Sequence, residues 1–360
     1  MKNIIKLIGV ITGTLFLMSS SCNNKPAPPT DDFDRAALLS NVSQHIIIPN
    51  YTELNSLAAD FKTSVSEFTE TPNVTNLNSL KDDWMNLYKQ WEHCKMFDFG
   101  PALDHSLLRR LNSFPSDTVK IEENIAANAY NLAVSAQTYA QGLPAFDYLL
   151  FHKENTEIIA ELDDSRKSYM IALADMIQSK VQSVNNDWVT YQTTFNQSTG
   201  NDASSSTSLL VNEMNKDFER IKNLKFKFPL GTDVLQMVQA KYIETRYSKN
   251  AFNLALENTK GIQNLYLGVA SNGSNGIGFD DYLIALGENG TLVNTNTSND
   301  FNELISYFEN YDGDIEEEMN SNYNRVNTHF ELYHGMVYHL KSELPSAISI
   351  LITYQDNDGD

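Results

Sequence analysis

The chain contains 360 residues, among them 26 lysines and arginines and 46 aspartates and glutamates, so its formal net charge is −20. This acidity argues against nucleic acid as a partner, because both molecules would be negatively charged, and it leaves cations and basic partners open. An acidic surface is equally an ordinary means of keeping a protein soluble. The length exceeds that of a usual single hydrophobic core and predicts two domains.

The first 21 residues have the layout of an export signal. Lys2 and Lys6 precede an apolar run over residues 7–18, and three serines follow before Cys22. The run is shorter than the ~20 residues needed to cross a bilayer, and no later segment reaches that length without charges. We therefore predict a signal peptide over residues 1–21 and a mature protein that is not transmembrane.

Cys22 resembles the cysteine that receives lipid in bacterial lipoproteins, although Ser19 replaces the apolar residue usual three positions earlier. Several acyl chains would hold the protein on a membrane, at ~0.8 kcal/mol per buried CH₂. The proline-containing segment 22–34 would provide the anchor and a tether. We predict a lipid-anchored protein of the cell envelope, facing the periplasm or the outside of a diderm bacterium. Cys94 is then the one remaining cysteine, so packing must hold the fold.

Apolar residues recur at the i, i+3, i+4, i+7 spacing of amphipathic helices through both halves of the body. The clearest runs cover residues 77–91, 173–191, 262–269 and 330–344. The pattern predicts an all-α fold of two helical bundles packed side by side. The β-branched run 348–352 is ambiguous by periodicity, and we expect it to be helical.

Prolines and polar stretches indicate where the helices end. Most prolines of the body fall between the periodic runs, where they would separate helices: Pro49, Pro72, Pro101, Pro115, Pro144, Pro229 and Pro345. The polar segment 198–208 is the best candidate for a flexible connection, and a second Gly/Ser/Asn patch lies at 271–278. The expected domains are an N-terminal bundle over residues 35–200 and a C-terminal bundle over 209–360.

The histidines do not form a convincing metal motif. In the densest group, His329, His334 and His339, neighbours are five residues apart, so on a helix they differ in direction by ~140°. The other four are isolated in sequence and are expected to be partly exposed structural residues. Common nucleophile, phosphate-loop and dinucleotide signatures are also missing from the sequence.

The closing segment 356–360 looks like the start of a calcium loop, but the distal glutamate that such a loop requires does not follow it. Its carboxylates, with Asp358 among them, are either a frayed tail or a local cation site. A bound metal ion, such as calcium, is therefore left open as a cofactor.

The most structured junction covers residues 141–151. Gly142 suits the position just after a helix, Pro144 suits the first turn of the next one, and Asp147 lies near that helix's positive end. The simplest interpretation is a helix–helix corner, in which the dipole stabilises Asp147 by ~0.3–1 kcal/mol and the carboxylate does no chemistry.

Several segments together resemble the imelysin-like family, a group of exported bacterial proteins linked to iron uptake, one branch of which is classed as peptidases. The resemblance covers nearly the whole mature chain. It rests on residues 84–101, 142–151, 228–231, 244–248 and 358–360. It implies two helical bundles side by side, in agreement with the periodicity.

The family's hallmark is Gly-x-His-x-x-Glu, and the aligned residues here are Gly142, Pro144 and Asp147. Proline can neither ligate a metal nor transfer a proton, so the peptidase activity implied by the family name is doubtful for this chain. The resemblance further implies that the corner lies near the contact between the bundles. The residues expected to line one cleft are Glu92, Gly142, Pro144, Asp147, Tyr247, Ser248 and Asp358, with Arg109 and Arg246 as available cationic partners.

Two functional hypotheses follow. The first is a membrane-anchored, non-catalytic binding protein associated with uptake of iron or another metal, whose interdomain cleft takes a small ligand, a metal or a partner protein of an uptake system. The second is a metallopeptidase of the imelysin type with a degenerate motif, using carboxylates and a histidine such as His93 beside Glu92. These two side chains point ~100° apart on one helix, which disfavours the second hypothesis. A purely structural surface scaffold is a third alternative.

Overall fold

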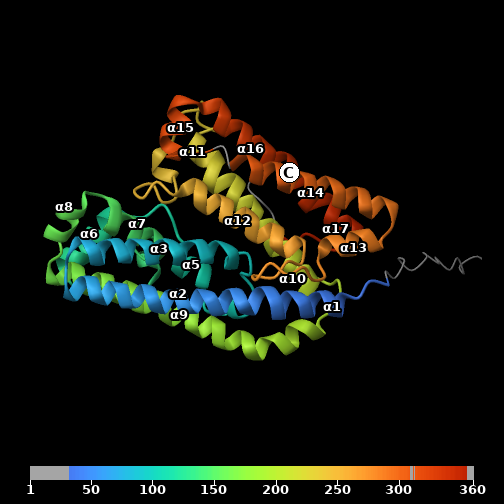
Figure 1. The fold of residues 1–360 in the computed structure, drawn as a ribbon, viewed down its shortest axis with the longest axis horizontal. Helices are drawn as coiled ribbons and strands as arrows, with labels where there is room; N and C mark the ends of the chain where they lie inside the picture. The colour runs from blue at the N-terminus through green and yellow to red at the C-terminus, as the bar shows by residue number, and fades with distance from the viewer. Residues whose placement is uncertain (1–31, 309–310, 312, 355–360) are drawn as a thin grey trace, which may run out of the picture. The chain divides into compact units, whose positions relative to one another are not determined.

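The long helices of the N-terminal half lie side by side (Figure 1). The computed structural model describes residues 32–308, 311 and 313–354, and the described residues from Asp34 onward belong to one compact unit. The predicted signal peptide, Cys22 and Asp358 lie outside the described residues.

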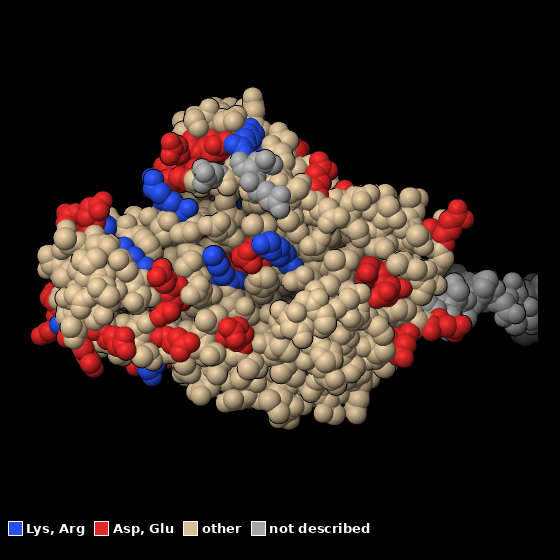
Figure 2. Space-filling model, in the orientation of Figure 1, with Lys and Arg blue, Asp and Glu red and all other residues tan. Residues whose placement is uncertain are grey.

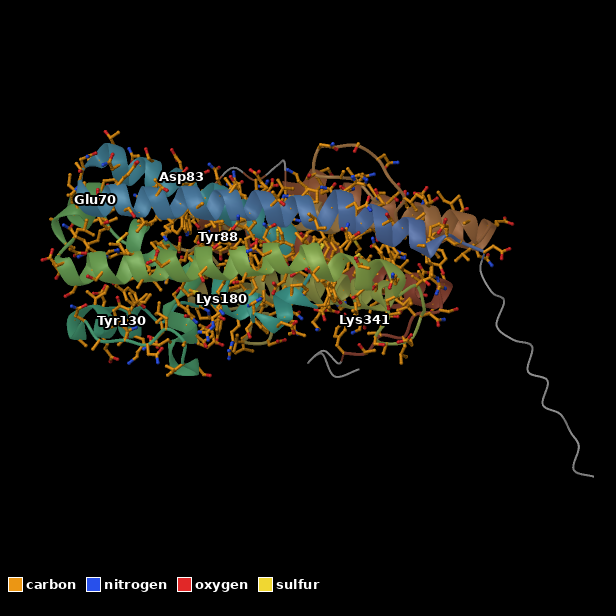
Figure 3. The ribbon with its side chains drawn as sticks, turned by 90° about the horizontal axis from the view of Figure 1, so that it is seen from below. Glu70, Asp83, Tyr88, Tyr130, Lys180 and Lys341 are labelled. Carbon is orange, nitrogen blue, oxygen red and sulfur yellow. The ribbon has the colours of Figure 1, made fainter. Side chains whose placement is uncertain are left out.

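In this half, α1 (Arg35–Asn41) continues through the π-helical segment η1 (Val42–Ile47) into α2 (Ile48–Glu70). Helix α2 packs against α3 (Val74–Cys94) and α9 (Asp164–Gln197). Figure 3 shows α2 and α9 extending along each other, with side chains filling the space between them. Shorter elements complete this half: α4 (Pro101–Asp104), α5 (Leu107–Leu111), α6 (Thr118–Ala127), η2 (Ser135–Ala140), α7 (Gly142–Phe151) and α8 (Asn155–Ala160).

The C-terminal half is a second set of packed helices. Helix α10 (Ser206–Arg220) continues into η3 (Ile221–Lys227), and both contact α12 (Ala251–Tyr266); α14 (Glu288–Phe308) packs between α12 and α16 (Tyr323–Tyr338). Helix α12 also packs against α3, which joins the two halves. The remaining elements are α11 (Phe228–Leu230), η4 (Ala240–Tyr242), α13 (Phe279–Ala285), α15 (Ile315–Ser321), η5 (His339–Glu343) and α17 (Leu344–Ala347).

The fold is all-α, as predicted. Within the described ranges no β-strand occurs, and one isolated bridge pairs Val269 with Asn275. None of the described helices is both long and apolar enough to cross a membrane. The predicted stripe on α3 is buried, with Trp84 and Tyr88 fully enclosed, and the stripe on α9 buries Trp188 in the same way. These apolar faces drive the packing of α2, α3 and α9, because burying one large side chain contributes about 1.5–3 kcal/mol.

Side-chain caps fix where the longest helices begin. The Asn73 side chain accepts a hydrogen bond from the Asn76 backbone N–H at the start of α3, at 2.9 Å. Asp163 does the same for Arg166 at the start of α9, at 2.8 Å. Each cap satisfies one of the backbone N–H groups that a helix start leaves without a partner, and contributes about 1 kcal/mol.

Three prolines lie inside continuous helices, although in sequence they indicate helix ends. Pro49, Pro229 and Pro345 each follow a π-helical segment (η1, η3 and η5) by two residues. A proline has no N–H to donate, and its ring collides with the carbonyl four residues earlier in an α-helix. The wider π turn removes that collision, so the helix continues past the proline.

Two further expectations about local structure are corrected. The run 348–352 is irregular, not helical: α17 ends at Ala347, and Ser349 adopts a left-handed φ of 59°. Its isoleucines at 348 and 350 are nonetheless buried. The polar segment 198–208 is a loop only to residue 205, because α10 begins at Ser206, whose hydroxyl donates to the Phe195 carbonyl at 2.7 Å.

Candidate functional site

Two glutamates and two lysines are buried together where α3, η3 and the segment before α12 meet. Lys95 Nζ lies 2.8 Å from Glu92 Oε2, and Lys225 Nζ lies 3.1 Å from the same oxygen. Lys225 also forms an ion pair with Glu244. All four side chains are at most 5% exposed, so each charge depends on the others for compensation. We refer to Glu92, Lys95, Lys225 and Glu244 as the charge cluster.

Neutral donors complete the coordination of Glu244. The Tyr88 hydroxyl lies 2.9 Å from Glu244 Oε1, and Asn112 Nδ2 donates to the same oxygen at 3.0 Å. Tyr88 lies in the interior, among the side chains between the long helices (Figure 3). Glu244 is therefore held by a lysine from the C-terminal half and by two polar side chains from the N-terminal half.

The two carboxylates of the charge cluster have pKa values shifted in opposite directions. Burial favours the neutral form of Glu244, but Lys225 and Lys95 outweigh burial and lower its pKa to about 2. Burial raises the pKa of Glu92 despite the same two lysines, and nearby Glu244 adds to that rise. The pKa of Lys95 is raised, because attraction by Glu92, Asp217 and Glu244 exceeds the opposing effect of burial.

Asp147 of α7 connects the two halves. Its Oδ2 accepts a hydrogen bond from the Tyr247 backbone N–H at 3.0 Å, and its Oδ1 accepts one from the Ser248 N–H at 2.9 Å. The residue is 4% exposed. Burial raises its pKa to about 6, although the hydrogen bonds from Ser248 and Tyr247 oppose the shift. Both carboxylate oxygens are thus engaged in holding a backbone segment of the C-terminal half.

The corner that carries Asp147 leaves no room for a side chain at its first residue. Gly142 follows η2 with a left-handed φ of 78°, and a Cβ atom there would lie 2.4 Å from the Leu111 carbonyl oxygen. The Trp84 indole N–H donates to the Leu143 carbonyl at 3.1 Å, and Pro144 is buried in the first turn of α7. The corner is therefore fixed against both α3 and α5.

The structure brings most of the predicted cleft residues into one region. Asp147 is hydrogen-bonded to the backbone of Tyr247 and Ser248. Burial raises the pKa of Tyr88, and the negative charges of Glu244, Glu92 and Asp147 raise it further.

The two arginines named as available partners take no part in the charge cluster. Arg246 forms an exposed ion pair with Glu316 at 2.8 Å. Arg109 lines a separate cavity between α5 and η3.

Sequence reasoning missed the lysines that neutralise the carboxylates. Lys95 follows Glu92 by three residues, one helical turn, and that spacing was a usable signal. Lys225 lies 130 or more positions beyond both Glu92 and Lys95, and no local pattern indicates that pairing. Glu244 belongs to a segment that carries the family resemblance, but it was not predicted as a site residue.

Several of the described histidines pair with carboxylates, but no two of them share one. His93 Nε2 lies 3.0 Å from Glu257, on a different side from the cluster that holds Glu92. His329 is fully buried among aromatic rings, and burial lowers its pKa to about 3. His339 pairs with Glu343 at 2.5 Å and with Asp300 at 3.3 Å. In the part of the chain that the structure describes, no three His, Cys, Asp or Glu side chains gather in a way that could hold a metal ion.

A cavity of about 500 Å³ opens at the junction of the two halves. Residues of the N-terminal half form most of its wall, and Arg220 and Leu224 from α10 and η3 complete it. Asn112 lines the cavity and also donates to Glu244, so the cavity adjoins the charge cluster. On the face shown in Figure 2, basic and acidic side chains lie next to one another near the hollowed centre of the molecule. We call the cavity of about 500 Å³ lined by Arg109, Arg220 and Leu224 the junction cavity.

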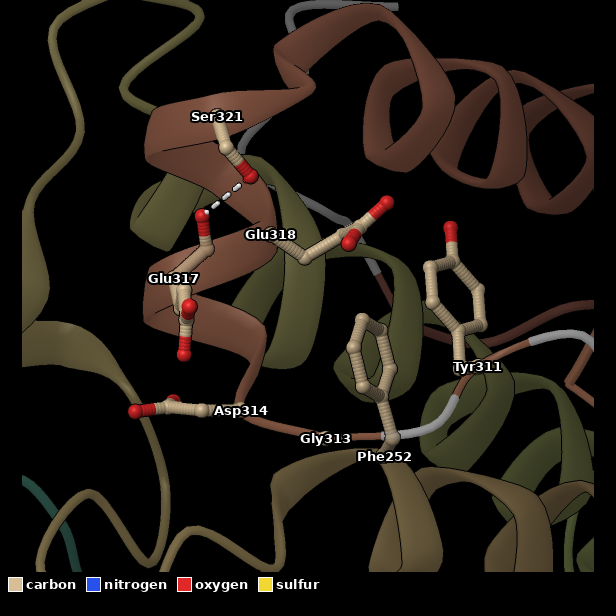
Figure 4. Close-up of a pocket in the computed structure, with 7 residues that line it drawn as sticks. All are labelled: Phe252, Tyr311, Gly313, Asp314, Glu317, Glu318 and Ser321. Carbon is tan, nitrogen blue, oxygen red and sulfur yellow. Dashed lines mark hydrogen bonds between the residues drawn. The ribbon is translucent and has the colours of Figure 1, made fainter.

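A second hollow, of about 150 Å³, lies at the start of α15 (Figure 4). Its lining combines the stacked rings of Phe252 and Tyr311 with the acids Asp314, Glu317 and Glu318. Lys249 pairs with Asp314 at 3.0 Å, and Arg325 pairs with Glu318 at 2.9 Å. Most of its negative charge is therefore already compensated.

The chain is similar to two solved structures and matches one family model. The chain is similar to a candidate iron-regulated protein A precursor from Parabacteroides distasonis, with a TM-score of 0.74 and 17% identity over 90% of this chain and 97% of the other. It is also similar to an imelysin-like protein from Psychrobacter arcticum, with a TM-score of 0.72 and 14% identity over 90% and 99%.

At these identities the two structures support the fold alone. No curated protein matches the chain in sequence. The family model for imelysin (Peptidase_M75) matches residues 47–333. Because that match covers most of the sequence and the fold agrees with it, the chain belongs to the imelysin family.

Proposed function

We propose that this imelysin-family chain is a non-catalytic binding protein of the cell envelope, associated with uptake of iron or another metal, which takes its ligand in the junction cavity. The observation that carries the proposal is the cavity itself: about 500 Å³, walled by both halves and adjoining the charge cluster through Asn112. This volume falls in the range of about 300–1,000 Å³ typical of small-ligand sites. The association with iron draws on the name of the Parabacteroides distasonis neighbour.

The arrangement of the acids supports a binding role over catalysis. Both oxygens of Asp147 accept backbone hydrogen bonds, and Glu92 and Glu244 are neutralised by lysines. A hydrolase needs a group that activates water and another that moves protons. Pro144, at the position of the family histidine, supplies neither group. The nearby carboxylates already bind backbone N–H groups or lysines that connect the two halves.

Titration calorimetry tests this proposal directly. The purified protein is titrated with ferrous, ferric, zinc and calcium ions, with haem and with short peptides, and we expect saturable binding of at least one. A Leu103→Trp variant, which places a bulky ring in the cavity wall, should weaken that binding. Leu292→Trp is the matched control, because the two leucines are 59% and 60% exposed but only Leu103 lines the cavity. Failure of every titrant to bind would reject the binding role.

The family designation keeps a second candidate open, a metallopeptidase with a degenerate motif. Chelator-sensitive cleavage of an unstructured protein such as casein, lost in Glu92→Ala or Asp147→Ala variants that remain folded, would establish it. We expect no cleavage above the buffer control.

The membrane anchor is tested separately in a bacterial expression host. We expect radiolabelled palmitate to be incorporated into the full chain but not into a Cys22→Ser variant. Equal labelling of the two proteins, or none in either, would contradict lipid attachment at this residue.

A further inference from the structure

The junction cavity contains two guanidinium groups whose bonding capacity is largely unused. Arg109 is exposed on α5, and its side chain makes no hydrogen bond or ion pair with any described residue. Arg220 Nη1 is buried without a hydrogen-bond partner among the described residues. The acids nearest to Arg220 are Asp98 and Asp217, at 3.8 and 3.9 Å, beyond hydrogen-bonding distance. The Arg220 side chain as a whole is 24% exposed and lines the cavity, so a ligand there can contact its guanidinium group although Nη1 itself is enclosed.

The charge of the lining favours a ligand with one negative charge. Arg109 and Arg220 contribute +2 and Asp98 contributes −1, so the lining carries 2 − 1 = +1, and buried Asp217 behind Arg220 offsets part of that charge. A doubly charged phosphate would meet Asp98 as well as the field of a chain whose formal charge is −20. A carboxylate has one charge, and its two oxygens match the planar fork of an arginine.

Most of the uncharged residues in the wall are apolar, and two of them are largely exposed. Leu103 is 59% exposed and Tyr139 is 53% exposed, although both line a concave surface. Leu108, Phe114 and Leu224 extend this apolar wall. A ligand that carried only a carboxylate would leave these side chains in contact with water, whereas an attached hydrocarbon or aromatic body would cover them.

One further feature of the lining is conformational. Ser106, which lies between Leu103 and Arg109 in the wall, has a left-handed φ of 52°. Non-glycine residues rarely adopt this conformation, and it costs of order 1–3 kcal/mol. Its hydroxyl bonds to no described side chain or backbone group, so it remains a free donor at the cavity.

We propose that the junction cavity binds a molecule with a single carboxylate and an apolar body, the carboxylate held by Arg109 and Arg220 and the body lying on Leu103, Tyr139 and Leu224. This inference rests on the proposed function, in which the junction cavity is the ligand site, and it adds the ligand's chemical class. The same chemistry is offered by a free aryl or alkyl carboxylic acid and by the C-terminus of a peptide that ends in an apolar residue.

Calorimetric titrations with matched probes separate these sources. The probes are 4-phenylbutyrate and its amide, and a tripeptide ending in phenylalanine as the free acid and as the C-terminal amide. We expect at least one free acid to bind saturably and its amide to bind about ten- to hundredfold more weakly, since the amide lacks the charge-assisted hydrogen bonds. Preference for 4-phenylbutyrate identifies a free acid, and preference for the tripeptide identifies a peptide terminus.

Variants of the two arginines assign the binding to this cavity. Arg109→Gln should weaken binding of the preferred acid about ten- to hundredfold, and Arg109→Lys should weaken it less, because charge is kept but the fork is lost. Lys62→Gln is the control for removing one surface cation, since Lys62 pairs with exposed Asp175 and does not line the cavity. Arg109 has no partner to lose, so Arg109→Gln should unfold at the same temperature as the wild type.

If an acid does bind, two results would still overturn the inference, and the absence of acid binding would overturn it as well. In the first, acid and amide bind equally well; in the second, Arg109→Gln binds the acid as tightly as Lys62→Gln does. If neither acid binds while a metal ion or haem does, the ligand class is wrong and the proposed binding function stands. If no titrant of any class binds, the proposed function fails together with this inference.

Discussion

Replacing Asp147 with asparagine should change how the stability of the protein depends on pH. Burial raises the pKa of Asp147 to about 6, whereas an aspartate in an unfolded chain titrates near ~3.9. Between these two values the folded protein binds more protons than the unfolded chain, so Asp147 makes the free energy of unfolding rise as the pH falls. Its unfavourable contribution is complete above the folded pKa and disappears below the unfolded one. Asparagine does not titrate, so Asp147→Asn should lack this component.

The magnitude follows from the two pKa values. At pH 7 the buried carboxylate lowers the free energy of unfolding by about 3 kcal/mol relative to a group that stays protonated, and at pH 5 by roughly half as much. The wild type should therefore gain on the order of 1 kcal/mol relative to Asp147→Asn between pH 7 and pH 5. At pH 7 itself the variant also loses a hydrogen bond to a charged acceptor, worth about 1.5–3 kcal/mol, so the two effects largely offset each other there.

Urea denaturation of both proteins at pH 7 and pH 5 measures this difference. Other groups that titrate in the same range, such as Asp280 with a pKa raised by burial to about 6, are present in both proteins and cancel in the comparison. A wild-type-minus-variant difference that stays constant between the two pH values would refute the reasoning. So would a change in the opposite direction, which would mean that the hydrogen bonds from Tyr247 and Ser248 dominate over burial.

Other residues give sharper tests of stability and reactivity. Lys225→Met should lower the free energy of unfolding, measured in urea, by about 3–5 kcal/mol, because it leaves two buried glutamates with one lysine. The control Lys62→Met, at an exposed ion pair, should lower it by only about 0–1 kcal/mol. Equal effects of the two substitutions would contradict the buried cluster. Gly142→Ala should lower the melting temperature, because the glycine has a φ of 78° and the added Cβ would collide with the Leu111 carbonyl. The control Gly335→Ala lies on an open helical surface and should raise the free energy of unfolding by up to about 1 kcal/mol. Cys94 is fully buried, and burial raises the pKa of its thiol. Iodoacetamide should therefore modify it only in urea, which peptide mass spectrometry can check. Rapid labelling of the native protein would show that this part of the core opens.

The helices could be predicted because apolar spacing is a local property of the chain. The stripe from Leu77 to Trp91 and the capping asparagine before it are sufficient to specify α3, and both are visible in sequence. Helix interruptions were harder to predict, because Pro49, Pro229 and Pro345 indicate helix ends unless a π turn precedes them. A π turn changes the hydrogen-bond pattern of the backbone without leaving a distinctive residue type.

The candidate site could be predicted only where it lies within single segments. The corner from Gly142 to Asp147 was visible from its turn chemistry, and the segment around Tyr247 and Ser248 entered through family resemblance. Their contact joins residues 100 and 101 positions apart. The compensation of Glu92 by Lys225 depends in the same way on how the halves pack. Such long-range pairing is set by tertiary structure, and a single sequence contains no direct signal for it.

The π turns also affect how the chain could tolerate changes in length. An α-helix has 3.6 residues per turn, so gaining or losing one residue rotates everything beyond it by ~100° and moves a buried stripe toward solvent. A π turn already accommodates one surplus residue, which means that deleting a residue there could restore an ordinary turn and keep the following stripe facing the core. Because η1, η3 and η5 each precede a proline, the shortened helix would then bring the proline ring against a carbonyl, unless that proline were replaced at the same time. A one-residue deletion at these three places should therefore be tolerated only together with loss of the neighbouring proline.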